Sequence, residues 1–228
     1  MTATRAITRV EFDGPAGALE GLLHVPAGAP RLLAVVAHPH PLFGGTMDNK
    51  VTYRVACALE GAPGIVLRFN FRGVRGSAGV HDRGRGEQDD LRAAMARVSA
   101  EAALLVADAN SLPIVLAGFS FGSVVSSRVA CAGQPGVSGL LLVGAPVLSH
   151  GFEELASRPA RLRVACVQGG RDEHGPEERL RAIWETVGGA GRLVLIPTAG
   201  HFFDDEQREL GEAVSSLTEF LAPLAPVS

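Results

Sequence analysis

Apolar residues in this chain fall into short, nearly continuous runs, and the segments between the runs carry apolar residues at every third or fourth position. Such short runs are typical of strands buried on both faces of a parallel sheet, and the intervening spacing is typical of helices packed on that sheet. The predicted strands cover residues 32–37, 65–71, 114–119, 139–143, 163–168 and 192–196. The predicted helices cover residues 46–60, 87–109, 120–132, 177–187 and 205–221.

The beginning of the chain follows another pattern. Two strand-like runs, 7–12 and 19–25, flank the turn sequence 13–17, which predicts an antiparallel hairpin. The strict alternation of strands and helices after it requires right-handed crossovers and so predicts a doubly wound, mostly parallel α/β sheet, with ligands bound at the carboxyl ends of its strands. Because no linker or repeat interrupts the pattern, we expect residues 1–228 to form a single domain.

Composition narrows the possible functions. With 46% hydrophobic residues the chain has a core to bury; because its net charge is −3 and it has no run of basic residues, we do not expect nucleic acid as a partner. Lys50 is the only lysine, and no glycine-rich loop precedes it as a phosphate-binding motif requires. Kinase and Schiff-base chemistry, which also depends on a lysine, is therefore disfavoured.

The cysteines and the apolar runs indicate the cellular compartment of the protein. Cys57, Cys131 and Cys166 lie far apart in apolar segments and form no disulfide or zinc pattern. The N-terminal residues lack the apolar run of a secretory signal, and the longest nearly apolar run, 137–148, is too short to span a bilayer. We therefore expect a cytoplasmic protein that does not interact with membranes.

The strongest local motif is Gly118-Phe119-Ser120-Phe121-Gly122, at the junction of a predicted strand and a predicted helix. A serine in this context sits on a strained turn, the nucleophile elbow, which projects its hydroxyl over the sheet. The helix that begins here directs its first N–H groups toward the same place. Ser120 is thus the candidate nucleophile, and the Phe121 amide is a candidate oxyanion donor.

A serine nucleophile needs a base, which in proteins with this elbow follows the serine along the chain. His201 lies in the loop after the last predicted strand, at the carboxyl edge of the sheet, and is the candidate base. We interpret His150 and His174 as solvated loop histidines.

The candidate acid is Asp172, in the turn that follows the strand 163–168. Glu173 and the pair 153–154 remain alternatives. Asp204 and Asp205 follow His201, and we interpret them as caps of the final helix.

Two further segments carry a family resemblance. Residues 38–50 read His-Pro-His-Pro-Leu-Phe-Gly-Gly-Thr-Met-Asp-Asn-Lys, and residues 70–73 read Asn-Phe-Arg-Gly. With the elbow, the acid turn and the His201 loop in the same order, the chain resembles, over nearly its whole length, a family of small bacterial esterase-like serine α/β-hydrolases. The resemblance implies the α/β-hydrolase fold and a Ser-Asp-His hydrolase. We expect no cofactor. One departure is residues 173–176, Glu-His-Gly-Pro, where the family tends to have apolar residues and a proline.

The 38–50 segment also has a physical interpretation, because the second oxyanion donor of an α/β hydrolase comes from the loop after this strand. Pro39 and Pro41 have no N–H, which leaves the amide of His40 or, as the alternate, that of Leu42. A metal pair of His38 and His40 is the competing interpretation, but residues 42–44 supply no further ligand, so we expect no metal.

Neighbouring side chains complete the expected site. The candidate lining of the substrate pocket is Leu42, Phe43, Phe202 and Phe203. For Arg72 we expect a structural ion pair with one of the carboxylates at the start of the next helix, Glu87, Asp89 or Asp90.

The spacing of the strands indicates the kind of substrate. Residues 144–162, between two predicted strands, are too few for a cap domain, so we expect an open, lidless site for small-molecule esters with short acyl groups. The expected activity is that of a carboxylesterase. A thioesterase or an amide or peptide hydrolase with the same residues, and a non-catalytic binding protein on a hydrolase fold, remain alternatives.

Overall fold

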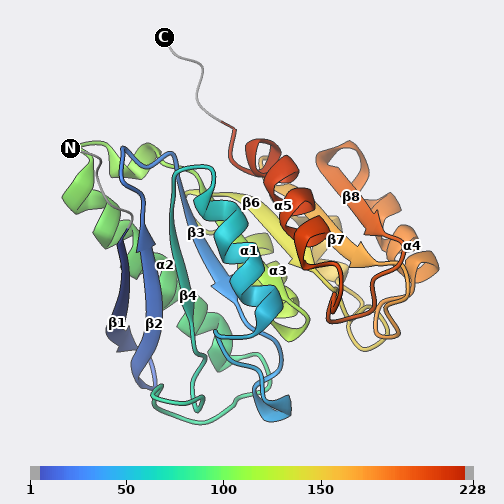
Figure 1. The fold of residues 1–228 in the computed structure, drawn as a ribbon, viewed down its shortest axis with the longest axis horizontal. Coiled ribbons are helices and arrows are strands. Elements are labelled where there is room, and N and C mark those ends of the chain that lie inside the picture. The colour runs from blue at the N-terminus through green and yellow to red at the C-terminus, as the bar shows by residue number, and fades with distance from the viewer. Residues whose placement is uncertain (1–5, 224–228) are drawn as a thin grey trace.

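A computed structural model describes residues 6–223 of the chain. The expectations of a single domain 1–228 and of an N-terminus without a signal run extend to residues 1–5 and 224–228, which lie outside the described residues. One sheet runs through the molecule, with strand order β1-β2-β4-β3-β5-β6-β7-β8 (Figure 1). Its strands are β1 (Ala6–Gly14), β2 (Gly17–Val25), β3 (Leu32–Ala37), β4 (Gly64–Phe69), β5 (Ile114–Phe119), β6 (Val137–Val143), β7 (Arg163–Gly169) and β8 (Gly191–Ile196).

The predicted N-terminal hairpin is confirmed. β1 pairs antiparallel with β2 up to the pair Gly14 and Gly17, and β2 pairs antiparallel with β4. The remaining neighbours, from β4 through β8, are parallel. The mostly parallel, doubly wound α/β sheet predicted from the apolar pattern is therefore correct.

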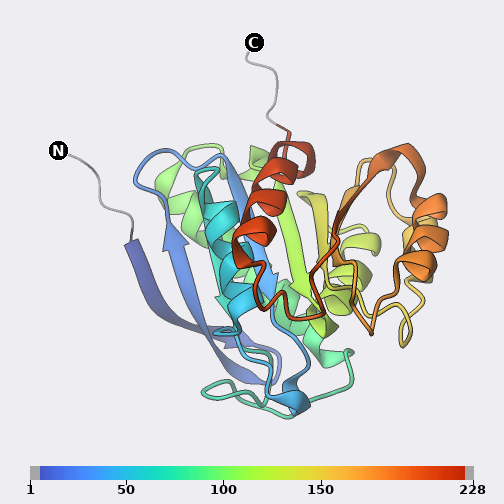
Figure 2. The same ribbon diagram turned by 45° about the vertical axis from the view of Figure 1, so that its right-hand side comes forward.

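Helices cover both faces of the sheet, as expected for strands that are apolar throughout. They are α1 (Lys50–Glu60), α2 (Gly86–Leu105), α3 (Phe121–Cys131), α4 (Glu177–Val187) and α5 (Gln207–Leu221). α1 and α5 pack side by side on one face, and α2, α3 and α4 lie on the other (Figures 1 and 2). Along β3 the side chains alternate between the two cores: Leu33, Val35 and Ala37 face the α2–α3 side, and the intervening residues face α1.

Some helices and strands end at other residues than predicted, because a side chain forms a hydrogen bond with the backbone there. α1 begins at Lys50 rather than at residue 46, because the Asn49 side chain accepts from the N–H groups of Val51 (2.9 Å) and Thr52 (3.3 Å) and so caps the helix. β4 ends at Phe69, where the side chain of Asn70 turns to bind the Met47 N–H at 2.7 Å.

The expectation of no cap domain is confirmed. The segment 144–162 between β6 and β7 contains one short 3-10 helix, Glu153–Ser157, among the described residues. Across residues 6–223, none of the helices combines the length and the apolar character needed to cross a membrane.

Candidate functional site

Ser120 occupies the sharp turn between β5 and α3. Its backbone has φ 53° and ψ −118°, a conformation that L-residues adopt only at a cost of about 1–3 kcal/mol. The turn is tight on both sides: a Cβ on Gly118 would overlap the backbone of Gly122, and one on Gly122 would overlap the carbonyl oxygens of Ala37 and His38. The two glycines of the motif therefore let α3 begin directly against the loop that follows β3.

The structure brings Ser120, His201 and Asp172 together from the ends of β5, β8 and β7. His201 Nε2 lies 3.0 Å from Ser120 Oγ, and His201 Nδ1 lies 2.8 Å from Asp172 Oδ2. Because a carboxylate can only accept a hydrogen bond, Nδ1 is the ring nitrogen that donates to Asp172 and carries the proton. Nε2 is then free to accept from the serine hydroxyl. Asp172 and His201 are both buried, with 3% and 4% of their surface exposed.

Four hydrogen bonds hold the Asp172 carboxylate. Oδ1 accepts from the backbone N–H groups of His174 (2.8 Å) and Gly175 (3.2 Å). Oδ2, which faces His201, also accepts from the side-chain amide of Gln168 at 2.8 Å. The acid loop is therefore built to fix one carboxylate orientation, although residues 173–176 depart from the family pattern.

Gln168 is a residue that the sequence analysis missed. It is fully buried at the end of β7; its Oε1 accepts from the Ala145 N–H at 2.8 Å and its Nε2 also donates to the Gly175 carbonyl at 3.0 Å. The amide thus links the loop after β6 to the acid loop. A polar residue ending an otherwise apolar strand, two positions after Cys166, is the signal that marks it in the sequence.

The loop after β3 folds tightly beside the serine. The N–H groups of Phe43 and Gly45 both donate to the His40 carbonyl at 3.1 Å, and Gly44 has φ 78°. The Leu42 N–H donates to His40 Nδ1 at 3.2 Å and is thus already engaged. Within residues 6–223 no acceptor binds the His40 N–H, so of the two expected oxyanion donors in this loop His40 is the one with a free amide.

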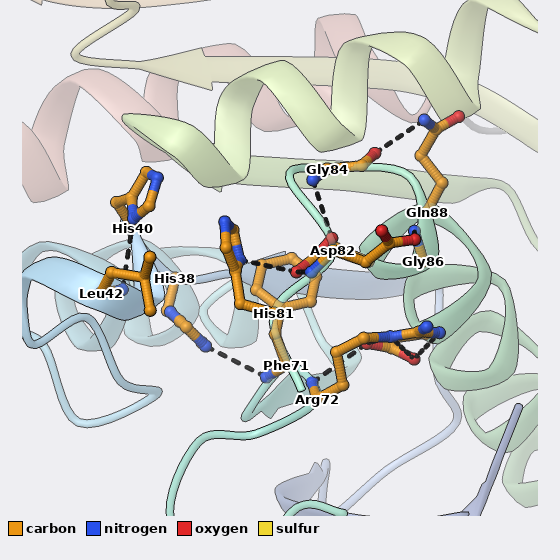
Figure 3. A network of polar contacts seen from close by, with 12 residues as sticks. His38, His40, Leu42, Phe71, Arg72, His81, Asp82, Gly84, Gly86 and Gln88 are labelled. Carbon is orange, nitrogen blue, oxygen red and sulfur yellow. Dashed lines mark hydrogen bonds and ion pairs between the residues drawn. The ribbon is translucent and has the colours of Figure 1, made fainter. Parts of the chain in front are cut away.

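His38 ties this loop to the one after β4 (Figure 3). Its Nε2 accepts from the Phe71 N–H at 3.0 Å, and its Nδ1 lies 2.6 Å from the Pro39 carbonyl oxygen. Burial lowers the pKa of His38 to about 4, so the ring is neutral at pH 7. Because both ring nitrogens are engaged by the backbone, His38 is not available to form a metal pair with His40.

Two buried carboxylates, those of Glu87 and Asp90, bind groups of the segment 71–86. Figure 3 labels their partners Arg72, His81, Asp82 and Gly84. Asp90 binds Arg72 through Nε (3.0 Å) and Nη2 (2.7 Å), which confirms the expected structural ion pair. Glu87 lies with Oε1 2.7 Å from His81 Nδ1, and its two oxygens accept from loop N–H groups at 2.8 Å. The His81 ring in turn packs on that of His40, with centroids 4.9 Å apart.

A cavity of about 420 Å³ opens over Ser120 and His201. Phe43 and Phe202 line it as expected, together with Pro39, His40, Phe121, Pro146, His150 and His174. Leu42 and Phe203 do not: Leu42 is 70% exposed outside the cavity, and Phe203 is fully buried in the core between α5 and the sheet.

The remaining candidates have other places. His150 and His174 are not merely solvated, because both line the cavity and the His174 ring packs against the His201 ring with centroids 4.5 Å apart. Burial, with a further contribution from Arg128, lowers the pKa of His150. Asp204 does not cap α5, which begins at Gln207 without a side-chain cap; it pairs with Lys50, the first residue of α1.

A serine on a positive-φ turn after the central parallel strand, with helices on both faces of the sheet, is the architecture of the α/β hydrolases. The chain belongs to the family of alpha/beta hydrolase domains, which it matches over residues 32–224.

Solved structures agree with this assignment. The chain is 35% identical to an alpha-beta serine hydrolase homologue from Coxiella burnetii, covering 95% of this chain and 97% of the other, with a TM-score of 0.80. It is 32% identical to a lidless α/β serine hydrolase from Xanthomonas campestris, covering 96% and 97%, with a TM-score of 0.82. An uncharacterised protein of Rickettsia prowazekii is 28% identical over 213 residues, or 91% of this chain and 87% of that protein.

Proposed function

We propose that the protein hydrolyses carboxylic esters of small or short-chain acyl groups through a covalent acyl-enzyme on Ser120. The observation that carries this proposal is the continuous chain of contacts from Ser120 Oγ through His201 to Asp172, at 3.0 and 2.8 Å. Relatives described as serine hydrolases support the class of reaction, and the open cavity with no cap domain supports small substrates.

In the first half of the proposed reaction, Ser120 Oγ attacks the ester carbonyl carbon while its proton passes to His201 Nε2. Asp172 orients the ring and stabilises the imidazolium. The tetrahedral oxyanion accepts from the amides of Phe121 and His40, since the first N–H groups of α3 have no partner within the helix and the His40 N–H is free.

Collapse of this intermediate breaks the bond to the alcohol, which takes the proton from His201 Nε2 as it leaves. Water then gives a proton to His201 and attacks the acyl carbon, and the second collapse releases the acid and returns the proton to Ser120. His201 thus donates each proton that it has accepted, and the proposed cycle uses only the ester, water and these side chains.

The test is Ser120→Ala. Removal of the nucleophile is expected to lower kcat on a short p-nitrophenyl ester by about 10⁴- to 10⁶-fold and to abolish labelling by a fluorophosphonate probe. Ser216→Ala, on the exposed side of α5, serves as the matched control and is expected to behave as the wild type. Wild-type hydrolysis or labelling by Ser120→Ala would disprove the assignment.

The same groups would act on a thioester or an amide, because acyl transfer to Ser120 does not depend on the leaving atom. Comparing kcat/KM on matched ester, thioester and anilide substrates separates these activities, and we expect the ester to react fastest. Failure of the probe to label the folded wild-type protein would favour a non-catalytic binding protein.

We also propose that the protein acts in the cytoplasm, because the cysteines are unpaired and buried or half-buried.

Cys131 and Cys166 do not compete with Ser120 as nucleophiles. Burial raises the pKa of Cys131 to about 11 and also raises that of Cys166, so neither thiol forms the reactive thiolate readily.

A further inference from the structure

Aromatic rings line the candidate site in two separate series, one that includes His40 and one that includes His201. The first runs from the loop after β3 to the start of α3: Phe43 packs on His40, and His40 packs on Phe121, each with ring centroids 4.8 Å apart. It lies on the side of the two proposed oxyanion amides. Its outer member, Phe43, is 87% exposed.

The second series lies on the side of the base. Phe202 packs on His201 with centroids 5.1 Å apart, and His201 packs on His174 at 4.5 Å, both edge to face. Its outer member, Phe202, is 45% exposed. Each series therefore presents one phenylalanine ring to solvent at the mouth of the cavity.

Phe43 and Phe202 both leave apolar ring surface exposed to water beside the nucleophile. Large apolar side chains at a cavity mouth keep an unfavourable contact with water until a ligand covers them. Phe43 is the last residue of the short 3-10 turn Pro41–Phe43, and the cavity that it borders reaches the nucleophile. Whatever covers Phe43 and Phe202 therefore lies beside the reacting carbonyl.

The described residues that line the cavity include no lysine, arginine, aspartate or glutamate. Its ionisable groups are four histidines, and burial lowers the pKa of two of them, His40 and His150. The lining thus offers no ammonium, guanidinium or carboxylate group to pair with an ionic substituent, and a buried unpaired ion is costly.

From these ring positions we infer that the cavity binds an uncharged aromatic ring between Phe43 and Phe202, so that the preferred substrates are aryl or arylalkyl esters. This inference rests on the proposed ester hydrolysis and names its substrate class. Aromatic pairs gain about 0.5–1.5 kcal/mol beyond the burial of their area when they meet edge to face or offset. A flat ring can make such contacts with both phenylalanines, whereas a saturated ring of the same size makes only apolar contact.

The test uses two pairs of esters whose members differ only in the saturation of the ring. Benzyl acetate against cyclohexylmethyl acetate probes the alcohol side, and methyl phenylacetate against methyl cyclohexylacetate probes the acyl side. The wild type is expected to show a kcat/KM about 5- to 10-fold higher for the aromatic member of at least one pair, which corresponds to roughly 1–1.4 kcal/mol. Equal values within each pair would overturn the inference.

Substitution locates the preference. In the double variant F43L/F202L the ratio of aromatic to saturated kcat/KM is expected to fall to near one; because the ratio is taken within one variant, a general loss of activity cancels. Leu104→Ala, which removes a side chain that is 80% exposed at the end of α2, is the control and is expected to keep the wild-type ratio. A wild-type ratio in F43L/F202L would overturn the inference.

The requirement for an uncharged ring is tested with 4-carboxybenzyl acetate, which should lose the advantage of benzyl acetate at pH 8. Equal kcat/KM for the two would overturn this part. The outcomes also separate this inference from the proposed function: equal rates on all esters with Ser120 still labelled contradict only the aromatic preference, whereas no hydrolysis and no labelling contradict both.

Discussion

Gln168 shows how a residue outside the proposed reaction can control it. Its amide shares the Asp172 oxygen that His201 uses, and the other end of the same amide is anchored by the Ala145 N–H. If Asp172 loses this donor, the carboxylate and the imidazole gain freedom to rotate. Misplacement of a reacting group by about 1 Å can lower the rate about 100-fold.

We therefore predict that Gln168→Leu lowers kcat by about 10- to 100-fold with little change in KM, because the defect lies in the orientation of the base and not in binding. Steady-state kinetics on a short ester, with circular dichroism to verify folding, measures this. Gln134→Leu, in the loop after α3, is the matched control. A folded Gln168→Leu protein with wild-type kcat would show that Gln168 only packs.

His38 makes a second prediction, which concerns stability. Its pKa is about 4 in the folded protein, against an ordinary value of 6.5. Between these values the unfolded chain binds more protons, so the free energy of unfolding falls as the pH drops from 6.5 toward 4.

In His38→Gln the amide oxygen can accept from the Phe71 N–H but does not titrate. Between pH 6.5 and 5 the wild type should lose on the order of 2 kcal/mol more stability than this variant, as measured by urea unfolding. The same loss in both proteins would mean that His38 does not carry this pH dependence.

At the scale of elements, the start of α3 is constrained by its close approach to the loop after β3. Gly122 lies where a Cβ would overlap the carbonyl oxygens of Ala37 and His38, and both the Phe121 amide and the His40 loop depend on that close approach. A side chain here would push α3 away from the loop after β3.

Gly122→Ala is accordingly expected to lower the free energy of unfolding by about 1–3 kcal/mol and to reduce kcat at the same time. Gly28→Ala makes the same change where a Cβ meets nothing within 4 Å, and it should alter neither quantity. Urea unfolding and ester hydrolysis, measured on both variants, check this. A Gly122→Ala protein as stable and as active as the wild type would refute it.

The elements themselves follow from the apolar pattern, because strands buried on both faces and amphipathic helices are local properties of the sequence. Their ends do not, since these depend on distant partners. Asn70 ends β4 by reaching Met47, which lies 23 residues earlier in the chain. Nor could spacing show that Asp204 would pair with Lys50, which is separated from it by 154 positions.

At the scale of the whole molecule, the three residues at the centre of the site could be proposed from the sequence because each follows a strand at the same edge of the sheet. Their surroundings could not. His150, His174 and Gln168 gain their places only when β6, β7 and β8 lie side by side, and Phe203 lies in the core because the final loop folds inward.

The lidless architecture makes a prediction about interfaces. With only a short 3-10 helix between β6 and β7 among the described residues, nothing there needs to open before substrate reaches Ser120. Activity on a short-chain triglyceride should rise smoothly with concentration and show no jump when the solubility limit is passed. A sharp increase at that limit, measured by titrating the released acid, would contradict this architecture.

The order of the sheet also has a consequence for the newly made chain. Ser120 precedes His201 by 81 positions, and β8 is the edge strand that docks on β7. A ribosome thus releases the serine and its helix long before the proton acceptor exists. On the proposed mechanism, the nascent chain therefore stays unreactive toward acyl groups until β8 has paired with β7 and brought His201 to Ser120.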